Sequence, residues 1–148
     1  MTGLSGSALE KRPGILASLS SRAAAAAQEL ARLAAAEGLP LTFTSGRRSA
    51  LDQAAAMLDK VRRGENLRTL YRSAGATLDR LFAAPQTAPA WAAIIAAAPP
   101  ISRHLTGDAV DIRTAGLTDG QVYRLGELAI AAGFARALRE ADHLHVQL

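Results

Sequence analysis

The sequence contains no cysteine and has few histidine, lysine and aromatic residues. Its 148 residues include no Cys, three His, two Lys and 4% aromatic residues. Without Cys the chain can form no disulfide, no thiolate metal site and no thiol nucleophile. A metal centre would therefore need histidine and carboxylate ligands, and three His leave few places to look for one.

The sequence also lacks a long apolar run and a clear export signal. The longest apolar run, residues 88–100, is bracketed by prolines and is shorter than the roughly 18–20 residues of a membrane-spanning helix. After Lys11 and Arg12, the apolar stretch is interrupted by Arg22 before it reaches the length of a signal-peptide core. We expect no membrane span. We also expect a chain that is cytoplasmic, is a processed form of an exported protein, or is released by another route.

The chain is moderately basic, with 17 Lys plus Arg against 13 Asp plus Glu and a formal net charge of +4. This charge is compatible with nucleic acid, anionic lipid or an anionic cell-wall polymer as a partner. However, the basic residues are scattered, and the six aromatic side chains offer few platforms on which bases could stack. We therefore expect no nucleic-acid partner, and the sequence indicates no oligomeric state.

The abundance of alanine and leucine, with 34 and 21 residues, favours a helix-rich fold. Apolar residues at steps of three or four predict helices over residues 15–37, 51–64, 66–83, 88–98 and 118–133. Alternating segments predict strands over 41–44 and 109–112, with one or two more within 134–148. Residues 1–13 are expected to form a flexible N-terminal arm. For residues 14–148 we predict a single α+β domain, in which a small, mainly antiparallel sheet packs against several helices.

All three histidines lie in the last third of the chain, and each is close to a carboxylate. The first segment runs from His104 to Asp111, and Gly107 between them allows a tight turn, so that both ends can face one ion. The second segment is Asp142–His145. A catalytic zinc site takes three protein ligands from His and carboxylate side chains and leaves a fourth position for water. Two segments that each offer His and Asp could supply that set, although each histidine taken singly is better explained as an ordinary loop or strand residue.

Strand geometry limits which side chains of the second segment can face one ion. In a regular strand His143 and His145 share a face, and Asp142 points with Leu144 to the other face. Asp142 can therefore reach the same site only if the chain bends there or is still entering the strand.

The histidine segments and an upstream arginine motif resemble those of a known enzyme family. The matching positions are Ser102-x-His104-x-x-Gly107-x-Ala109-x-Asp111, Asp142-x-x-His145, Ser45-Gly46-Arg47-Arg48-Ser49 and Gln53. Over residues 41–148 the chain resembles the zinc D,D-peptidase family of bacterial cell-wall enzymes. This family includes D-alanyl-D-alanine carboxypeptidases, D-Ala-D-Ala dipeptidases and phage L-alanyl-D-glutamate endopeptidases, and its fold resembles the hedgehog signalling domain.

The resemblance implies that His104, Asp111 and His145 bind Zn2+. It also implies that Asp142 is the general base and that Arg48 binds the substrate carbonyl and its developing oxyanion. These roles fit the chemistry, because zinc lowers the pKa of a bound water to about 7 and a nearby carboxylate can accept its proton. An aspartate base, where many relatives have glutamate, is typical of the endopeptidase branch.

The chain departs from the family pattern at two positions. Arg47 stands where relatives often have an aromatic residue, so either arginine of the pair could act, and we favour Arg48. His143 could replace the neighbouring histidine as a ligand, support the site, or contact the substrate. The resemblance also makes Ser102, Gln53 and His143 candidates for substrate binding.

The sequence therefore predicts a hydrolase, a zinc metallopeptidase that cuts a peptidoglycan stem peptide or a related D-amino-acid peptide. Carboxypeptidase, dipeptidase and endopeptidase action all remain open. An enzyme acting on the cell wall would be periplasmic or secreted, although the start of the chain does not read as a signal peptide. The alternative is a catalytically inactive hedgehog-like domain that binds metal or cell-wall peptide, and the intact set of His and Asp residues argues against it.

Overall fold

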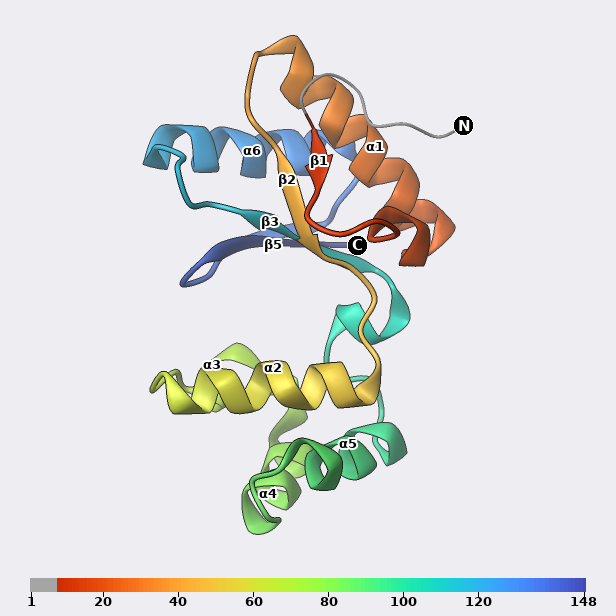
Figure 1. The fold of residues 1–148 in the computed structure, drawn as a ribbon, viewed down its shortest axis with the longest axis vertical. Coiled ribbons are helices and arrows are strands. Elements are labelled where there is room, and N and C mark those ends of the chain that lie inside the picture. The colour runs from red at the N-terminus through yellow and green to blue at the C-terminus, as the bar shows by residue number, and fades with distance from the viewer. Residues whose placement is uncertain (1–7) are drawn as a thin grey trace. The chain divides into compact units, whose positions relative to one another are not determined.

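The computed structural model describes residues 8–148, which divide into two compact units (Figure 1). The sheet unit comprises the described residues up to Arg47 together with Thr106–Leu148, and the helical unit comprises Arg48–Leu105. The mixed α+β class is confirmed, with six α-helices and one five-stranded sheet in the described residues. That residues 14–148 act as a single domain stays a prediction. Residues 1–7 of the expected N-terminal arm lie outside the described residues.

The sheet has the strand order β1-β2-β3-β5-β4. Its strands are β1 (Leu9–Glu10), β2 (Thr42–Ser45), β3 (Ala109–Arg113), β4 (Arg136–Arg139) and β5 (His143–Gln147). Only the short pairing of β1 with β2 is parallel, and the other three pairings are antiparallel. The predicted mainly antiparallel sheet is therefore confirmed. The sequence did not predict β1, which occupies two residues of the expected arm.

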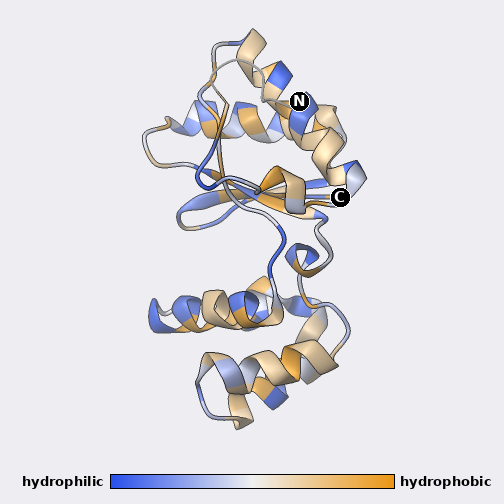
Figure 2. Ribbon diagram, turned by 45° about the vertical axis from the view of Figure 1, so that its right-hand side comes forward, coloured by the Kyte–Doolittle hydropathy of each residue, from blue (hydrophilic) through white to orange (hydrophobic). Residues whose placement is uncertain are grey.

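Two helices, α1 (Ser21–Ala36) and α6 (Asp119–Ala132), cover one face of this sheet (Figure 1). The inward face of α1 is built largely from alanine, whose small side chain lets helix and sheet approach closely, and Figure 2 shows the apolar character of this helix. Alternate residues of the strands complete the core. These strand residues are Phe43, Val110, Ile112, Leu144 and Val146.

The helical unit contains the remaining four α-helices and has a core of its own. These are α2 (Ala50–Arg62), α3 (Leu67–Leu70), α4 (Gly75–Ala83) and α5 (Ala88–Ala97). Trp91 of α5 is fully buried at the centre, with its ring edge-on to Phe82 at a centroid distance of 5.7 Å. Among the described residues, no helix is both long and apolar enough to span a membrane.

Two predicted helices are broken in the structure, and local capping explains one of the breaks. The helix expected over residues 15–37 begins as the 3-10 turn η1 (Leu16–Ser18) and restarts at α1, where the Ser20 hydroxyl accepts a hydrogen bond from the main-chain N–H of Ala23. The helix expected over 66–83 is interrupted at Tyr71, whose φ of −121° and ψ of 56° are not helical. The predicted start of α6 is confirmed, because Thr118 and Gln121 form a reciprocal capping box.

Candidate metal centre

Asp111 and His145 lie opposite each other on β3 and β5, which are neighbouring strands. Val110 and Ile112 are buried in the core, so the alternation of side chains along β3 turns Asp111 to the other face of the sheet. The Oδ1 atom of Asp111 lies 3.1 Å from Nδ1 of His145. Their side chains are only 3% and 10% exposed, so this pair is largely shielded from water.

His104 is the third member of this group. It lies in η3 (Arg103–Thr106), a 3-10 turn that leads through Gly107 into β3. Gly107 has a φ of +78°, a left-handed conformation that favours glycine, and this confirms the predicted tight turn. One ligand atom from each of His104, Asp111 and His145 lies within 4.8 Å of the other two. These three residues are therefore close enough to hold one metal ion.

The donor set of this group suits zinc. Two imidazoles and one carboxylate form the kind of three-ligand set that catalytic zinc sites use, with a fourth position left for water. In a tetrahedral site with metal–ligand distances of about 2.0–2.1 Å, two donor atoms are about 3.3 Å apart. The separation of 3.1 Å between His145 and Asp111 is close to this value. A metal further requires that Nδ1 of His145 present a lone pair rather than a proton.

His143 is surrounded by carboxylates and is not a member of the group of three. Its Nε2 lies 3.6 Å from Asp111 and 3.5 Å from Glu140, and its Nδ1 lies 2.6 Å from Asp142. Burial alone lowers the pKa of His143, but hydrogen bonds with Glu140 and Asp142 and the charges of Asp111 and Glu140 raise that pKa to about 9. His143 is therefore an imidazolium at neutral pH. In that form both ring nitrogens are donors, and both face protein carboxylates, so neither offers a lone pair to a metal.

Two carboxylates flank the group of three, and the sequence had pointed to only one of them. Asp142 immediately precedes β5, so it lies outside the regular strand, as its expected role requires; its side chain is 63% exposed and contacts His143. Glu140 is only 14% exposed, and its carboxylate lies 4.0 Å from Nδ1 of His145. The general base stays a prediction for Asp142, and Glu140 is a second carboxylate, which lies close to one of the three candidate ligands.

The neighbouring arginines have different hydrogen-bond partners. In the sheet unit, Arg47 donates from Nε to the main-chain oxygen of Ser18 at 2.9 Å and from a terminal nitrogen to that of Thr106 at 3.1 Å. In the helical unit, Arg48 donates to Oε1 of Gln53 at 3.4 Å. Arg47 therefore joins two backbone segments, and Arg48 remains the arginine that we expect to meet a substrate. That role stays a prediction.

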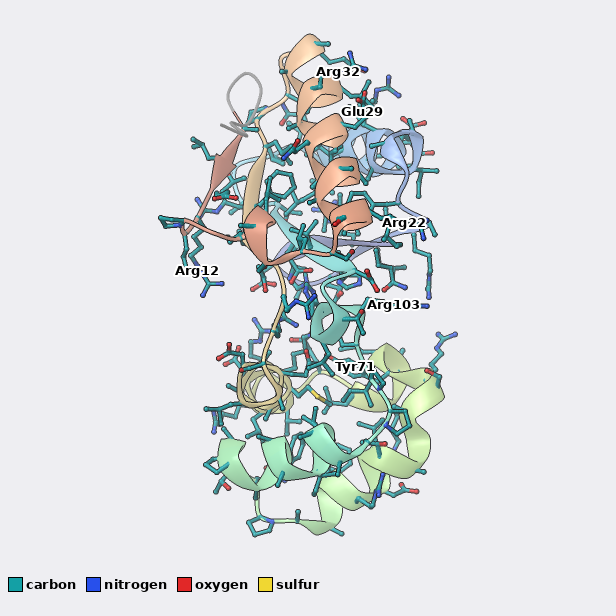
Figure 3. All side chains as sticks on the ribbon, turned by 90° about the vertical axis from the view of Figure 1, so that its right-hand side faces the viewer. Arg12, Arg22, Glu29, Arg32, Tyr71 and Arg103 are labelled. Carbon is teal, nitrogen blue, oxygen red and sulfur yellow. The ribbon has the colours of Figure 1, made fainter. Side chains whose placement is uncertain are left out.

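Gln53 is fully buried on α2, and both ends of its amide are bonded within the helical unit. Its Oε1 accepts from Arg48, and its Nε2 donates to the hydroxyl of Tyr71 at 3.1 Å (Tyr71 is labelled in Figure 3). Lys60, only 7% exposed, also donates to this hydroxyl and lies over the ring at 5.4 Å from its centroid. These contacts make Gln53 a support for Arg48, whereas its expected contact with substrate stays a prediction.

Short side chains hold the loop that joins η3 to β3. The two carboxylate oxygens of Asp108 accept hydrogen bonds from the hydroxyls of Ser20 at 2.7 Å and Thr106 at 2.8 Å. This ties the loop to the N-terminal cap of α1. Ser102 accepts a hydrogen bond from the main-chain N–H of His104 at 3.2 Å. Ser102 therefore supports a candidate ligand, and its expected contact with substrate stays a prediction.

Comparison with known protein families shows the family to which this chain belongs. A family model for VanY, D-alanyl-D-alanine carboxypeptidase, matches residues 16–138. The chain belongs to the VanY family. No curated protein matches it. Membership confirms the resemblance seen in the sequence and supports a D,D-carboxypeptidase-type peptidase that acts on the cell wall.

The match to the VanY family covers Arg48, His104 and Asp111 and ends before β5. Two residues in the part of the site that the family match does not cover were not predicted from the sequence. Glu140 belongs to no motif, and its main-chain N–H donates to the oxygen of His143 across the β4–β5 turn at 2.8 Å. Gln147 lies two residues after His145, a spacing that places both on one face of β5 and could have indicated it.

Proposed function

We propose that this VanY-family protein is a zinc-dependent peptidase that hydrolyses the stem peptides of peptidoglycan. The observation that carries the proposal is the group of His104, Asp111 and His145, whose ligand atoms lie within 4.8 Å of one another. These three residues would hold the ion. Zinc bound there would supply a water with a pKa of about 7 and would polarise the scissile carbonyl.

The other site residues would bind and orient the substrate and move the proton. Asp142 would accept the proton of the attacking water and deliver it to the leaving amine. Arg48 would donate hydrogen bonds to the carbonyl oxygen as negative charge develops there, a contribution of about 3 kcal/mol. His143 would contact a carboxylate or carbonyl oxygen of the peptide by exchanging one of its carboxylate partners for that oxygen, which suits a substrate that ends in D-alanine.

Digestion of purified muropeptides tests the reaction, with the products identified by mass spectrometry. We expect zinc-loaded protein to release the terminal D-alanine, chelation to abolish this activity, and added zinc to restore it. Products of cleavage at an internal bond of the stem peptide would instead indicate an endopeptidase. Full activity in protein that contains no stoichiometric metal would refute the zinc mechanism.

Variants in which a carboxylate is replaced by its neutral amide test which residue is the general base. Asp142→Asn should lower kcat by about 10²–10⁴-fold, the usual contribution of a general base, while zinc content stays normal. Asp79→Asn is the matched control, because its side chain is 68% exposed against 63% for Asp142. Activity retained in Asp142→Asn but lost in Glu140→Gln would assign the base to Glu140. A wild-type protein that binds zinc without turnover would favour the inactive hedgehog-like alternative.

The proposed substrate also implies where the protein works. Peptidoglycan with complete stem peptides lies outside the cytoplasmic membrane, so we propose action in the periplasm or outside the cell. Fractionation of cells that produce the protein, followed by immunodetection, tests this location, and protein found only in the cytosol would contradict it.

A further inference from the structure

Both ring nitrogens of His145 have a close partner within the sheet unit. Nδ1 lies 3.1 Å from Oδ1 of Asp111, and Nε2 lies 2.8 Å from Oε1 of Gln147. Gln147 is well placed to hold this contact, because β5 lies between two strands and Gln147 is paired with Ala109 on one side and Arg136 on the other. The backbone of Gln147 is therefore held on both sides by neighbouring strands.

The amide oxygen of Gln147 determines which nitrogen of His145 carries the proton. A carbonyl oxygen only accepts hydrogen bonds, so Nε2 of His145 must donate to it. A neutral imidazole has one ring proton, and with that proton on Nε2 the lone pair lies on Nδ1. Nδ1 then faces the carboxylate of Asp111, so two acceptors are brought together. Such a pair becomes favourable when a cation lies between the two atoms, either a metal ion or a second ring proton on Nδ1.

We propose that Gln147 is a positioning residue that selects the Nε2–H tautomer of His145 and thereby makes Nδ1 the metal-binding atom. This inference rests on the proposed zinc function. Metal-bound histidines commonly donate their second ring N–H to an oxygen of the protein, and the loss of such a partner typically lowers metal affinity by 10–100-fold. Without Gln147 the proton is free to move to Nδ1, where it bonds to Asp111 and competes with the metal.

Zinc affinity and the tautomer together test the role of Gln147. We would measure zinc binding by competition with a chromophoric chelator for the wild type, Gln147→Leu and Gln147→Glu. Gln147→Leu should bind zinc 10–100-fold more weakly. Gln147→Glu should restore the affinity, because a carboxylate also only accepts hydrogen bonds. Gln28→Leu is the control for loss of an amide, since Gln28 is exposed on α1, and it should bind zinc like the wild type.

The second measurement is the nitrogen NMR spectrum of the His145 ring in metal-free protein. The wild type should carry a proton on Nε2, whether or not Nδ1 is also protonated by its contact with Asp111. Gln147→Leu should lose the Nε2 proton and keep only a proton on Nδ1, which a merely structural role would not predict. Wild-type affinity and an unchanged tautomer in Gln147→Leu would overturn the proposal. A wild type that binds no zinc would refute the proposed function, and the tautomer shift would still decide whether Gln147 selects the proton position.

Discussion

Substitution of Gly107 by alanine tests how tightly the loop before β3 is constrained. Gly107 has a φ of +78°, and an alanine in this left-handed conformation costs about 1–2 kcal/mol. A Cβ added there would also lie 2.8 Å and 3.0 Å from two nitrogens of the Arg47 guanidinium and 3.0 Å from the main-chain nitrogen of Ser20. The guanidinium would have to move, which weakens its hydrogen bonds to Ser18 and Thr106.

We expect Gly107→Ala to lower the free energy of unfolding by about 2–4 kcal/mol, because a disturbed hydrogen bond to a charged group adds about 1–2 kcal/mol to the backbone cost. For a chain of this size the corresponding drop in Tm is about 5–12 °C. Gly116→Ala is a matched control. Gly116 has a φ of +81°, but nothing lies within 4 Å of an added Cβ, so only the backbone cost of about 1–2 kcal/mol applies.

Urea unfolding followed by far-UV circular dichroism measures both variants against the wild type. The decisive quantity is the difference between them, which should be at least about 1 kcal/mol, and it should shrink in an Arg47→Ala background if the guanidinium causes it. Equal destabilisation of the two glycine variants would refute the argument from close approach. Gly107→Ala should also weaken zinc binding, because the loop joins His104 to Asp111.

Two further perturbations address the two units separately. Trp91→Ala should cost about 3–5 kcal/mol, because a fully buried indole leaves a large cavity in the helical unit, and amide hydrogen exchange should show the loss of protection in α2 and α5. In the sheet unit, hydrogen bonds from Arg124 hold the pKa of Glu37 below its ordinary value of 4.5. A lowered pKa stabilises the fold above pH 4.5 and ceases to do so as the pH falls through the folded-state pKa. Glu37→Gln should therefore lower Tm at pH 7 and make no difference in acid, and an equal effect at both pH values would contradict this.

Local signals in the sequence predicted the helix starts well and the helix breaks poorly. Ser49 and Thr118 cap α2 and α6, and their pattern of a hydroxyl followed three residues later by a polar side chain is local in the sequence. The break at Ser20 was hidden, because the apolar period of η1 continues into α1 and both bury side chains in one core. The break at Tyr71 depends on partners in α2 that no local pattern specifies.

The site also combines features that the sequence predicted with features that depend on contacts distant in the sequence. The resemblance to the zinc D,D-peptidase family implied the set of His104, Asp111 and His145, and the structure brings these three residues together. Spacing could not separate Arg47 from Arg48, because the difference lies in carbonyl groups far along the chain. Glu140 was missed for a related reason, since its approach to the histidines depends on the turn between β4 and β5.

The position of the candidate ligands in the sheet follows from the core on its opposite face. Asp111 and His145 are paired because β3 and β5 each bury the residues on either side of them, which are Val110, Ile112, Leu144 and Val146. Each of these four side chains stabilises the fold by about 1.5–3 kcal/mol. A slip of β5 by one residue against β3 would turn Leu144 and Val146 to the other face, a loss of about 3–6 kcal/mol. That loss is a large part of the whole stability of a typical domain, about 5–15 kcal/mol. Burial of apolar side chains therefore holds Asp111 opposite His145 before any metal binds. The fold would therefore present these two residues to a metal as a pre-formed pair of donors.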